Sequence, residues 1–134
     1  MVARFFSLDG RLARLPFFLR GIQVAIGAAV IFFLSLPLFM NGGRALWWAG
    51  ILVVALAGAV IVIATVSLTV RRLHDLNLSG YHAIWVIAAQ AVSEVLSYGS
   101  AKMMLFGLPV AAIGLWLMFW PGNKQANRFG AVPD

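Results

Sequence analysis

Long uncharged stretches, separated by a few charged residues, dominate this chain. Each stretch approaches or exceeds the roughly 20 residues that an α-helix needs to cross about 30 Å of hydrocarbon. Backbone N–H and C=O groups find no water in a bilayer, so these stretches are expected to be helical. The charge-free intervals lie between Arg20 and Arg44, Arg44 and Arg71, Asp75 and Glu94, and Lys102 and Lys124. They predict four transmembrane helices at about residues 18–40, 45–72, 81–98 and 103–120.

Short connections link the four predicted helices. They lie at residues 41–43, 77–80 and 98–100, and each contains glycine, which tolerates the left-handed backbone of helix ends. Because the connections are short, successive helices must run antiparallel. The expected fold class is an all-α membrane protein. Residues 1–134 are predicted to form a single four-helix transmembrane domain, arranged as an antiparallel up-down bundle.

The composition favours a membrane protein and excludes an ordinary soluble enzyme. Of the 134 residues, 63% are hydrophobic and only 10% are charged, whereas soluble domains carry about 25% charged residues. The mean hydropathy of +0.96 agrees. The chain has no cysteine, which removes disulfides, thiolate nucleophiles and cysteine metal ligands. With only two histidines in addition, we expect no metal site and no cofactor.

The distribution of basic residues predicts the orientation in the membrane. Four Lys and Arg residues lie within residues 1–20, two within 71–80 and two in the tail, against one in each of the two connections on the opposite side. This bias predicts that both termini are cytoplasmic. Topology thereby accounts for the formal charge of +6. We expect anionic membrane lipids as partners, and no nucleic acid.

The chain ends are predicted to lie at the cytoplasmic membrane face. A short N-terminal segment, at about residues 4–16, is expected to lie in the interface, with Arg11 and Arg14 on one helical face. Its apolar stripe would consist of Leu8, Leu12 and Leu15. Pro16 suits the first turn of the helix that follows. A cytoplasmic tail is expected over residues 121–134.

Polar residues of three segments are expected to meet at this face. The candidates for an anion-binding site or a structural clasp are Arg11, Arg14, Arg71, Arg72, His74, Asp75, Asn127 and Arg128. Arg71 and Asp75 have the i, i+4 spacing of a helical charge pair. Asn127 and Arg128 carry donors that would tie the tail to Asp75. Phe129 is then expected to pack under the loop.

One further polar pair lies inside a predicted span. Glu94 is the only acidic residue within the predicted spans, and Gln90 shares its helical face. Two interpretations stay open. Glu94 either reaches the interface and pairs with Lys102 or Arg44, or it belongs to a transport path with Gln90.

Three motifs resemble the signatures of a known family, in order and over nearly the whole chain. They are Gly10-Arg11-x-x-Arg14, Arg71-Arg72-Leu73-His74-Asp75 followed by Ser79-Gly80, and Pro121-Gly122 followed by Asn127-Arg128-Phe129-Gly130. The chain is similar to the YhaH/YhaI-like family of small bacterial inner-membrane proteins, domain-of-unknown-function family eight hundred and five. The resemblance implies a four-helix protein of the bacterial inner (plasma) membrane and supplies no activity.

These features leave three classes of function. The leading hypothesis is a non-enzymatic membrane protein whose polar cluster clasps the loops together or binds an anionic phospholipid headgroup or an acidic partner protein. The alternative is a small transporter or channel, assembled as a homo-oligomer, that uses Glu94 and Gln90. An enzyme is the third, with His74, Asp75 and Ser79 as its candidate residues, although the chain carries no familiar catalytic motif.

Overall fold

A computed structural model describes residues 6–40, 43–97 and 107–133, with the side chains of 94–97 and 107 outside the description. Within these ranges the regular secondary structure is helical, and the only β-type pairing is an isolated bridge between Asn127 and Gly130. The described helices are α1 (Arg14–Met40), α2 (Arg44–Asp75), α3 (His82–Ser97) and α4 (Gly107–Phe119). The prediction of an all-helical chain with four helices is confirmed for these ranges.

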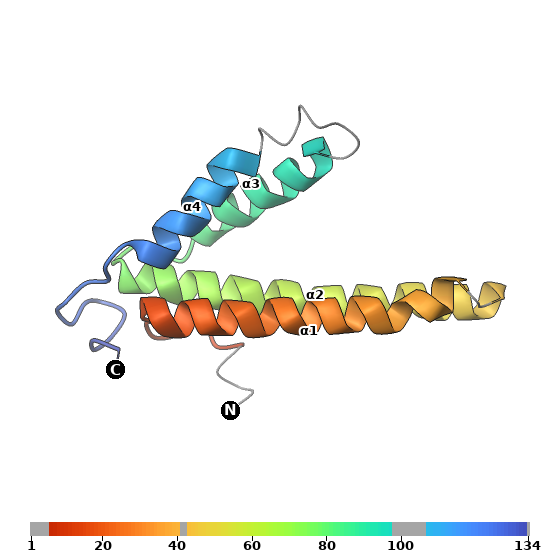
Figure 1. Ribbon diagram of the computed structural model, residues 1–134. Helices are drawn as coiled ribbons and strands as arrows, with labels where there is room; N and C mark the ends of the chain where they lie inside the picture. The colour runs from red at the N-terminus through yellow and green to blue at the C-terminus, as the bar shows by residue number, and fades with distance from the viewer. Residues whose placement is uncertain (1–5, 41–42, 98–106, 134) are drawn as a thin grey trace.

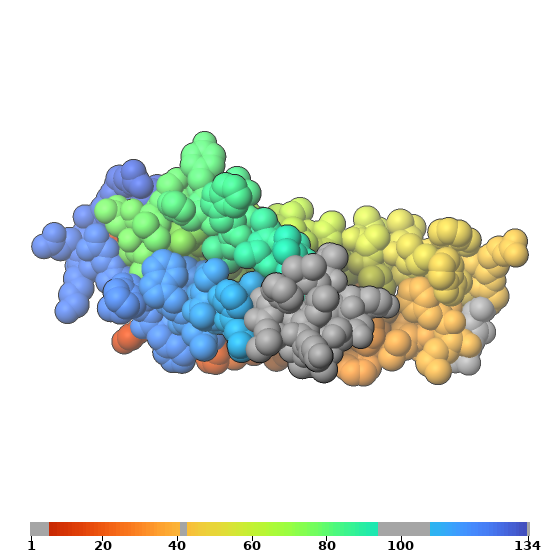
Figure 2. Space-filling model, turned by 90° about the horizontal axis from the view of Figure 1, so that it is seen from above, coloured from red at the N-terminus to blue at the C-terminus, as the bar shows by residue number. Residues whose placement is uncertain are grey.

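The four helices form two hairpins that meet at one end (Figure 1). α1 and α2 lie side by side as a long antiparallel pair. α3 and α4 form a shorter pair, which contacts the first pair near the end of α2 and the start of α1 and then inclines away. Seen from above, the far end of the α1–α2 pair extends beyond the second hairpin (Figure 2). The arrangement therefore differs from the predicted bundle, because the hairpins pack together over only part of their length.

The start of α1 contradicts the helical conformation expected for the N-terminal segment, whereas its location in the membrane interface stays a prediction. Residues 7–13 are not helical, and α1 already begins at Arg14, with Pro16 in its first turn. Gly10 adopts a φ of +84°, which no helix allows, so Arg11 and Arg14 do not share a helical face. Leu12 is buried and does not belong to a lipid-facing stripe. Its backbone N–H is bonded across to α2, which explains why this segment lies against the protein.

The other bounds agree with the sequence pattern to within a few residues. α2 continues through Asp75, three residues past its predicted end. The whole motif Arg71-Arg72-Leu73-His74-Asp75, which we call the RRLHD motif, is therefore helical. α3 begins at His82 and α4 ends at Phe119, each one residue from the prediction. The predicted positions 98 and 103–106 lie outside the described residues.

The two long helices are compatible with a membrane. α1 has 27 residues and α2 has 32, and both are long and apolar enough to cross a bilayer. Only 6% of the most apolar stretch of α1 and 17% of that of α2 is buried within the protein. The apolar helices described at 82–93 and 108–119 are shorter than a full span. Two of the four predicted spans therefore meet the length requirement within the described residues.

A small apolar core lies where the hairpins meet. Val70 and Leu73 of α2 pack with Ala83 of α3 and Leu117 of α4. Phe17 of α1 packs against this group from the side. All four helices therefore contribute to one contact region, which fixes the position of the second hairpin against the first.

Shortening the central core side chain should destabilise the protein. Leu73 is 1% exposed, so Leu73→Ala leaves a cavity and is expected to lower the free energy of unfolding by about 2–5 kcal/mol. Leu56→Ala is the matched control, because Leu56 of the same helix is 62% exposed and should lose about 0.5 kcal/mol or less. Denaturant unfolding in detergent micelles measures both. Equal losses in the two variants would contradict this packing.

Candidate functional site: an arginine clasp

The last turn of α2 is held rigidly by the way the helix ends. Asn77 has a φ of +60°, a left-handed conformation that asparagine tolerates better than most residues. Its N–H donates to the His74 carbonyl at 3.0 Å, and the Leu78 N–H donates to the Leu73 carbonyl at 2.8 Å. This pair of bonds is a Schellman motif, and Leu78 adds the apolar contact that accompanies it. The charged residues of the last turn are therefore held on a well-ordered helix end.

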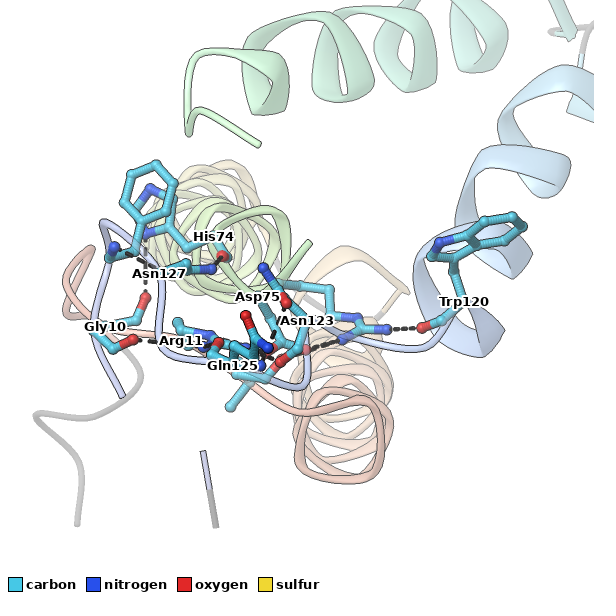
Figure 3. A network of polar contacts seen from close by, with 12 residues as sticks. Gly10, Arg11, His74, Asp75, Trp120, Asn123, Gln125 and Asn127 are labelled. Atoms are coloured by element: carbon cyan, nitrogen blue, oxygen red, sulfur yellow. Dashed lines mark hydrogen bonds and ion pairs between the residues drawn. The ribbon is translucent and has the colours of Figure 1, made fainter. Parts of the chain in front are cut away.

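Two other chain segments meet at this helix end (Figure 3). The N-terminal segment is attached by the Leu12 N–H, which donates to the Arg71 carbonyl at 3.0 Å. The tail is attached by the Asn123 N–H, which donates to the Asp75 carbonyl at 2.8 Å. The three polar segments identified in the sequence therefore lie together in the structure.

Asp75 is the centre of the polar cluster. Its carboxylate is shared by two arginines that are 64 and 3 residues away in sequence. Arg11 donates from Nε and Nη2 to Oδ1 at 3.1 and 2.9 Å, and Arg72 donates from Nη1 to Oδ2 at 2.5 Å. The side chains of Arg11, Arg72 and Asp75 are 1%, 0% and 4% exposed. We call these three residues the arginine clasp.

Arg11 has an acceptor for each of its donors. Two of its five N–H groups reach Asp75, and the other three reach backbone carbonyls of the tail. Nη1 donates to the Gln125 carbonyl at 2.8 Å and to the Gly130 carbonyl at 3.4 Å, and Nη2 donates to the Asn123 carbonyl at 2.5 Å. This one side chain therefore joins the N-terminal segment to α2 and to the tail.

Arg72 joins α2 to the end of α4. Its Nε donates to the Leu117 carbonyl at 2.7 Å, and its Nη2 donates to the Trp120 carbonyl. These carbonyls belong to the last turn of α4 and the residue after it, where a helix has unpaired acceptors and the negative end of its dipole. Arg72 Nη1 also lies 3.5 Å from the carbonyl oxygen of Leu12. The guanidinium thus caps α4 while it pairs with Asp75.

A second set of contacts fastens the tail beside the clasp. The ring of Phe129 stacks on that of His74, with centroids 3.9 Å apart and planes 5° from parallel, and Arg128 lies over the same phenyl ring at 4.7 Å. His74 Nδ1 is 3.1 Å from the Gly10 carbonyl, so Nδ1 must carry the hydrogen of this contact. Asn127 donates from Nδ2 to the His74 carbonyl at 2.9 Å.

Several contacts differ from the predicted ones. Asp75 pairs with Arg72 at i, i+3 and with Arg11, and not with Arg71 as the i, i+4 spacing suggested. Asn127 donates to the His74 carbonyl and not to Asp75 as predicted, and Arg128 lies over the ring of Phe129. The tail reaches Asp75 through the backbone N–H of Asn123. The reason lies in helix geometry, since positions three and four apart are both within reach and the tertiary contacts of Arg72 decide between them.

The remaining predicted residues occupy different environments. Arg71 is buried, whereas Arg14 and Arg128 are exposed at the rim of the cluster. Gln90 lines a cavity of about 240 Å³ between α2 and α3, and the Glu94 side chain lies outside the described residues. The transport path therefore stays a prediction. Across the described ranges, no group of three or more His, Asp or Glu side chains is placed to hold a metal ion.

The residues missed by sequence reasoning act mainly through their backbone. The carbonyls of Leu117, Trp120 and Gln125 accept hydrogen bonds from the clasp, and carbonyls leave no trace in side-chain chemistry. Gly122 matters for the space that it leaves, because a Cβ there would overlap Asp75 Oδ2. The glycine of the Pro121-Gly122 motif is therefore required by the close approach of the tail to the carboxylate.

Adding a methyl group at Gly122 should break the attachment of the tail. The Asp75 carboxylate cannot move aside, because two arginines hold it, so Gly122→Ala is expected to cost about 2–4 kcal/mol of stability. Gly114→Ala is the control, since a Cβ at Gly114 meets nothing within 4 Å. Thermal unfolding in detergent and protease sensitivity of the tail measure the effect. A Gly122→Ala protein as stable as the control would refute the close approach.

Comparison with known proteins places this chain in a family. A family model described as "Protein of unknown function (DUF805)" matches residues 5–131. The matched range includes the N-terminal segment, the end of α2 and most of the tail, so it covers every residue of the clasp. No curated protein and no solved structure matches the chain. The narrower likeness to YhaH and YhaI stays a resemblance. With nearly its whole length matched, the chain belongs to the DUF805 family.

Proposed function

We propose that the protein is a multi-pass protein of the bacterial inner membrane that acts by binding and not by catalysis. In this proposal, the arginine clasp builds a rigid platform at the cytoplasmic face, and exposed basic residues around it bind an anionic group. The exposed apolar surfaces of α1 and α2 support the membrane location, because a water-soluble protein rarely exposes contiguous apolar patches of that size.

The placement of the clasp supports the proposed orientation. The described parts of the N-terminal segment and the tail lie at one end of the α1–α2 pair, together with the last turn of α2 (Figure 1). This end carries four basic residues: Arg11 in the N-terminal segment, Arg14 at the start of α1, and Lys124 and Arg128 in the tail. Positively charged segments are retained on the cytoplasmic side, so this end is assigned to the cytoplasm.

The saturation of Arg11 is the observation that carries the clasp role. All five of its N–H donors have acceptors within the chain, so Arg11 has none to spare for a ligand. Buried charges are costly to leave unpaired, and each acceptor here belongs to a segment that must be in place. The arginine donors that Asp75 does not accept are therefore bonded to backbone carbonyls. In this proposal, the buried arginines hold the fold together and do not bind a ligand.

The same contacts argue against an acid–base role for the RRLHD motif. Both oxygens of Asp75 are occupied by guanidinium groups, and the Nδ1 of His74 faces the Gly10 carbonyl. Ser79 Oγ accepts from the Tyr81 N–H at 3.4 Å, and within the described residues no hydrogen bond joins it to His74. A serine, histidine and aspartate arranged in this way do not form the relay that nucleophilic catalysis requires.

The clasp role predicts strong coupling between Arg11 and Asp75. Asp75→Asn leaves two buried guanidiniums without a counter-charge and should cost about 3–5 kcal/mol, and Arg11→Gln should cost a similar amount. In a double-mutant cycle, the combined loss is expected to fall at least about 1.5 kcal/mol short of the sum of the two single losses. Reversible unfolding in mixed micelles gives the three values. Simple additivity would remove the clasp interpretation.

The orientation can be tested by labelling, since the parent chain has no cysteine to remove. Gln125→Cys places a thiol on the exposed tail, and Gly43→Cys places one at the exposed start of α2. In intact cells, a membrane-impermeant maleimide is expected to react with Gly43→Cys alone, and with Gln125→Cys only after the membrane is opened. Labelling of Gln125→Cys from outside would overturn the proposed orientation.

A further inference from the structure

Two neighbouring hollows of different character share one wall at the start of α1. The first, which we call the charged cavity, has a volume of about 230 Å³ and lies between the start of α1 and the tail, with charged side chains in an otherwise largely apolar wall. The second is an apolar groove of about 340 Å³ between α1 and α4. Arg14 lines both. The other residues that line the charged cavity are Ala13, Asp75, Pro121, Gly122, Asn123, Lys124, Val132 and Pro133. Those of the groove are Leu15, Phe18, Met118 and Phe119.

The basic side chains of the charged cavity are suited to an anion. Arg14 and Lys124 are exposed basic residues in its wall. Asp75 also faces it, but two buried arginines already compensate that carboxylate. Ala13 caps α1, since its carbonyl accepts from the Phe17 N–H at 3.0 Å, so the positive end of the dipole of a 27-residue helix adds to the field.

The groove is suited to a hydrocarbon chain. Apart from Arg14, its lining is wholly apolar, and it opens between residues that are well exposed, with Leu15 at 62% and Phe119 at 67%. In a protein that crosses the membrane through α1, this groove faces the lipid side of the polar cluster. Because Arg14 lines both hollows, a ligand that fills them needs an anionic group next to a hydrocarbon chain. An anionic amphiphile has both parts, whereas a free anion or an acidic peptide lacks the hydrocarbon chain.

We propose that the two hollows together bind one anionic glycerophospholipid, with its phosphate at Arg14 and Lys124 and part of an acyl chain in the groove of Leu15, Phe18 and Met118. This inference rests on the proposed membrane location and names the anionic group of the platform. It assigns recognition to the exposed Arg14 and Lys124, whereas the buried Arg11 and Arg72 only support the site.

The test compares lipids of one chain composition. Protein purified in a neutral detergent is titrated with phosphatidylglycerol or phosphatidylcholine, and bound lipid is counted by native mass spectrometry. Phosphatidylglycerol is expected to bind at least tenfold more tightly. Arg14→Gln should weaken its binding about fivefold, and Lys124→Gln should do the same, because each basic residue contributes roughly that factor near an anionic lipid. Arg44→Gln removes the same charge from the opposite end of α2 and should leave affinity within twofold.

Three results would overturn the proposal. Equal weakening by Arg14→Gln and Arg44→Gln would indicate diffuse attraction of lipid to the basic protein. Competition by glycerol phosphate at the concentration of the lipid would indicate a free-anion site in which the groove has no part. Equal affinity for the two lipids would remove anion recognition. Unchanged unfolding midpoints of the variants in phosphatidylcholine show that the fold is intact, and Lys124→Gln on the exposed tail serves if Arg14→Gln unfolds.

The lipid site and the broader proposal fail in different ways. Loss of lipid selectivity, with Gln125→Cys protected from external label, leaves the membrane platform in place without this occupant. Labelling of Gln125→Cys from outside removes the platform and the lipid site together, whatever the titration shows.

Discussion

The structure depends on one carboxylate held between two guanidiniums. Asp75 lies on the last turn of α2, Arg72 lies one turn before it, and Arg11 arrives from the N-terminal segment. Removing Asp75 would leave two buried guanidiniums without a counter-charge, at a cost of about 3–5 kcal/mol, which is comparable to much of the stability of a small domain. Removing either arginine would leave buried acceptors without their donors. Each arginine also binds carbonyls from a further segment, so this single ion cluster sets the relative positions of α2, α4 and both terminal segments.

Polar contacts carry more of the specificity here than apolar packing does. The apolar cluster at the junction of the hairpins contains four buried residues, and seven apolar residues are buried in the described part of the chain, whereas most of α1 and α2 is apolar but exposed. In a lipid environment, burying such surface between helices gains little, because lipid tails are equally apolar. A network with fixed donors and acceptors then selects one arrangement among many of similar apolar contact. The clearance at Gly122, where even a methyl group would overlap Asp75, shows how tightly that arrangement is defined.

The sequence predicted the elements well and the contacts less well. Uncharged intervals located all four helices, and topology correctly brought the N-terminal segment, the RRLHD motif and the tail together. Spacing alone could not choose Arg72 over Arg71 as the partner of Asp75, because both positions lie within reach on a helix. The choice depends on the carbonyls of α4, which have no side-chain signature. The left-handed φ of Gly10 was likewise not predicted, because the spacing of Arg11 and Arg14 suggested a helix there.

The long sequence separations within the clasp have a consequence for biosynthesis. Arg11 bonds to the carbonyls of Gln125 and Gly130, 114 and 119 residues later in the chain. A nascent polypeptide emerges from its N-terminus, so Arg11 reaches the ribosome exit long before those acceptors are translated. The hairpins can insert while the arginine is still hydrated, but these bonds can form only after Gln125 and Gly130 have left the ribosome. A chain cut before residue 123 would therefore leave Arg11 without the carbonyls of Asn123, Gln125 and Gly130.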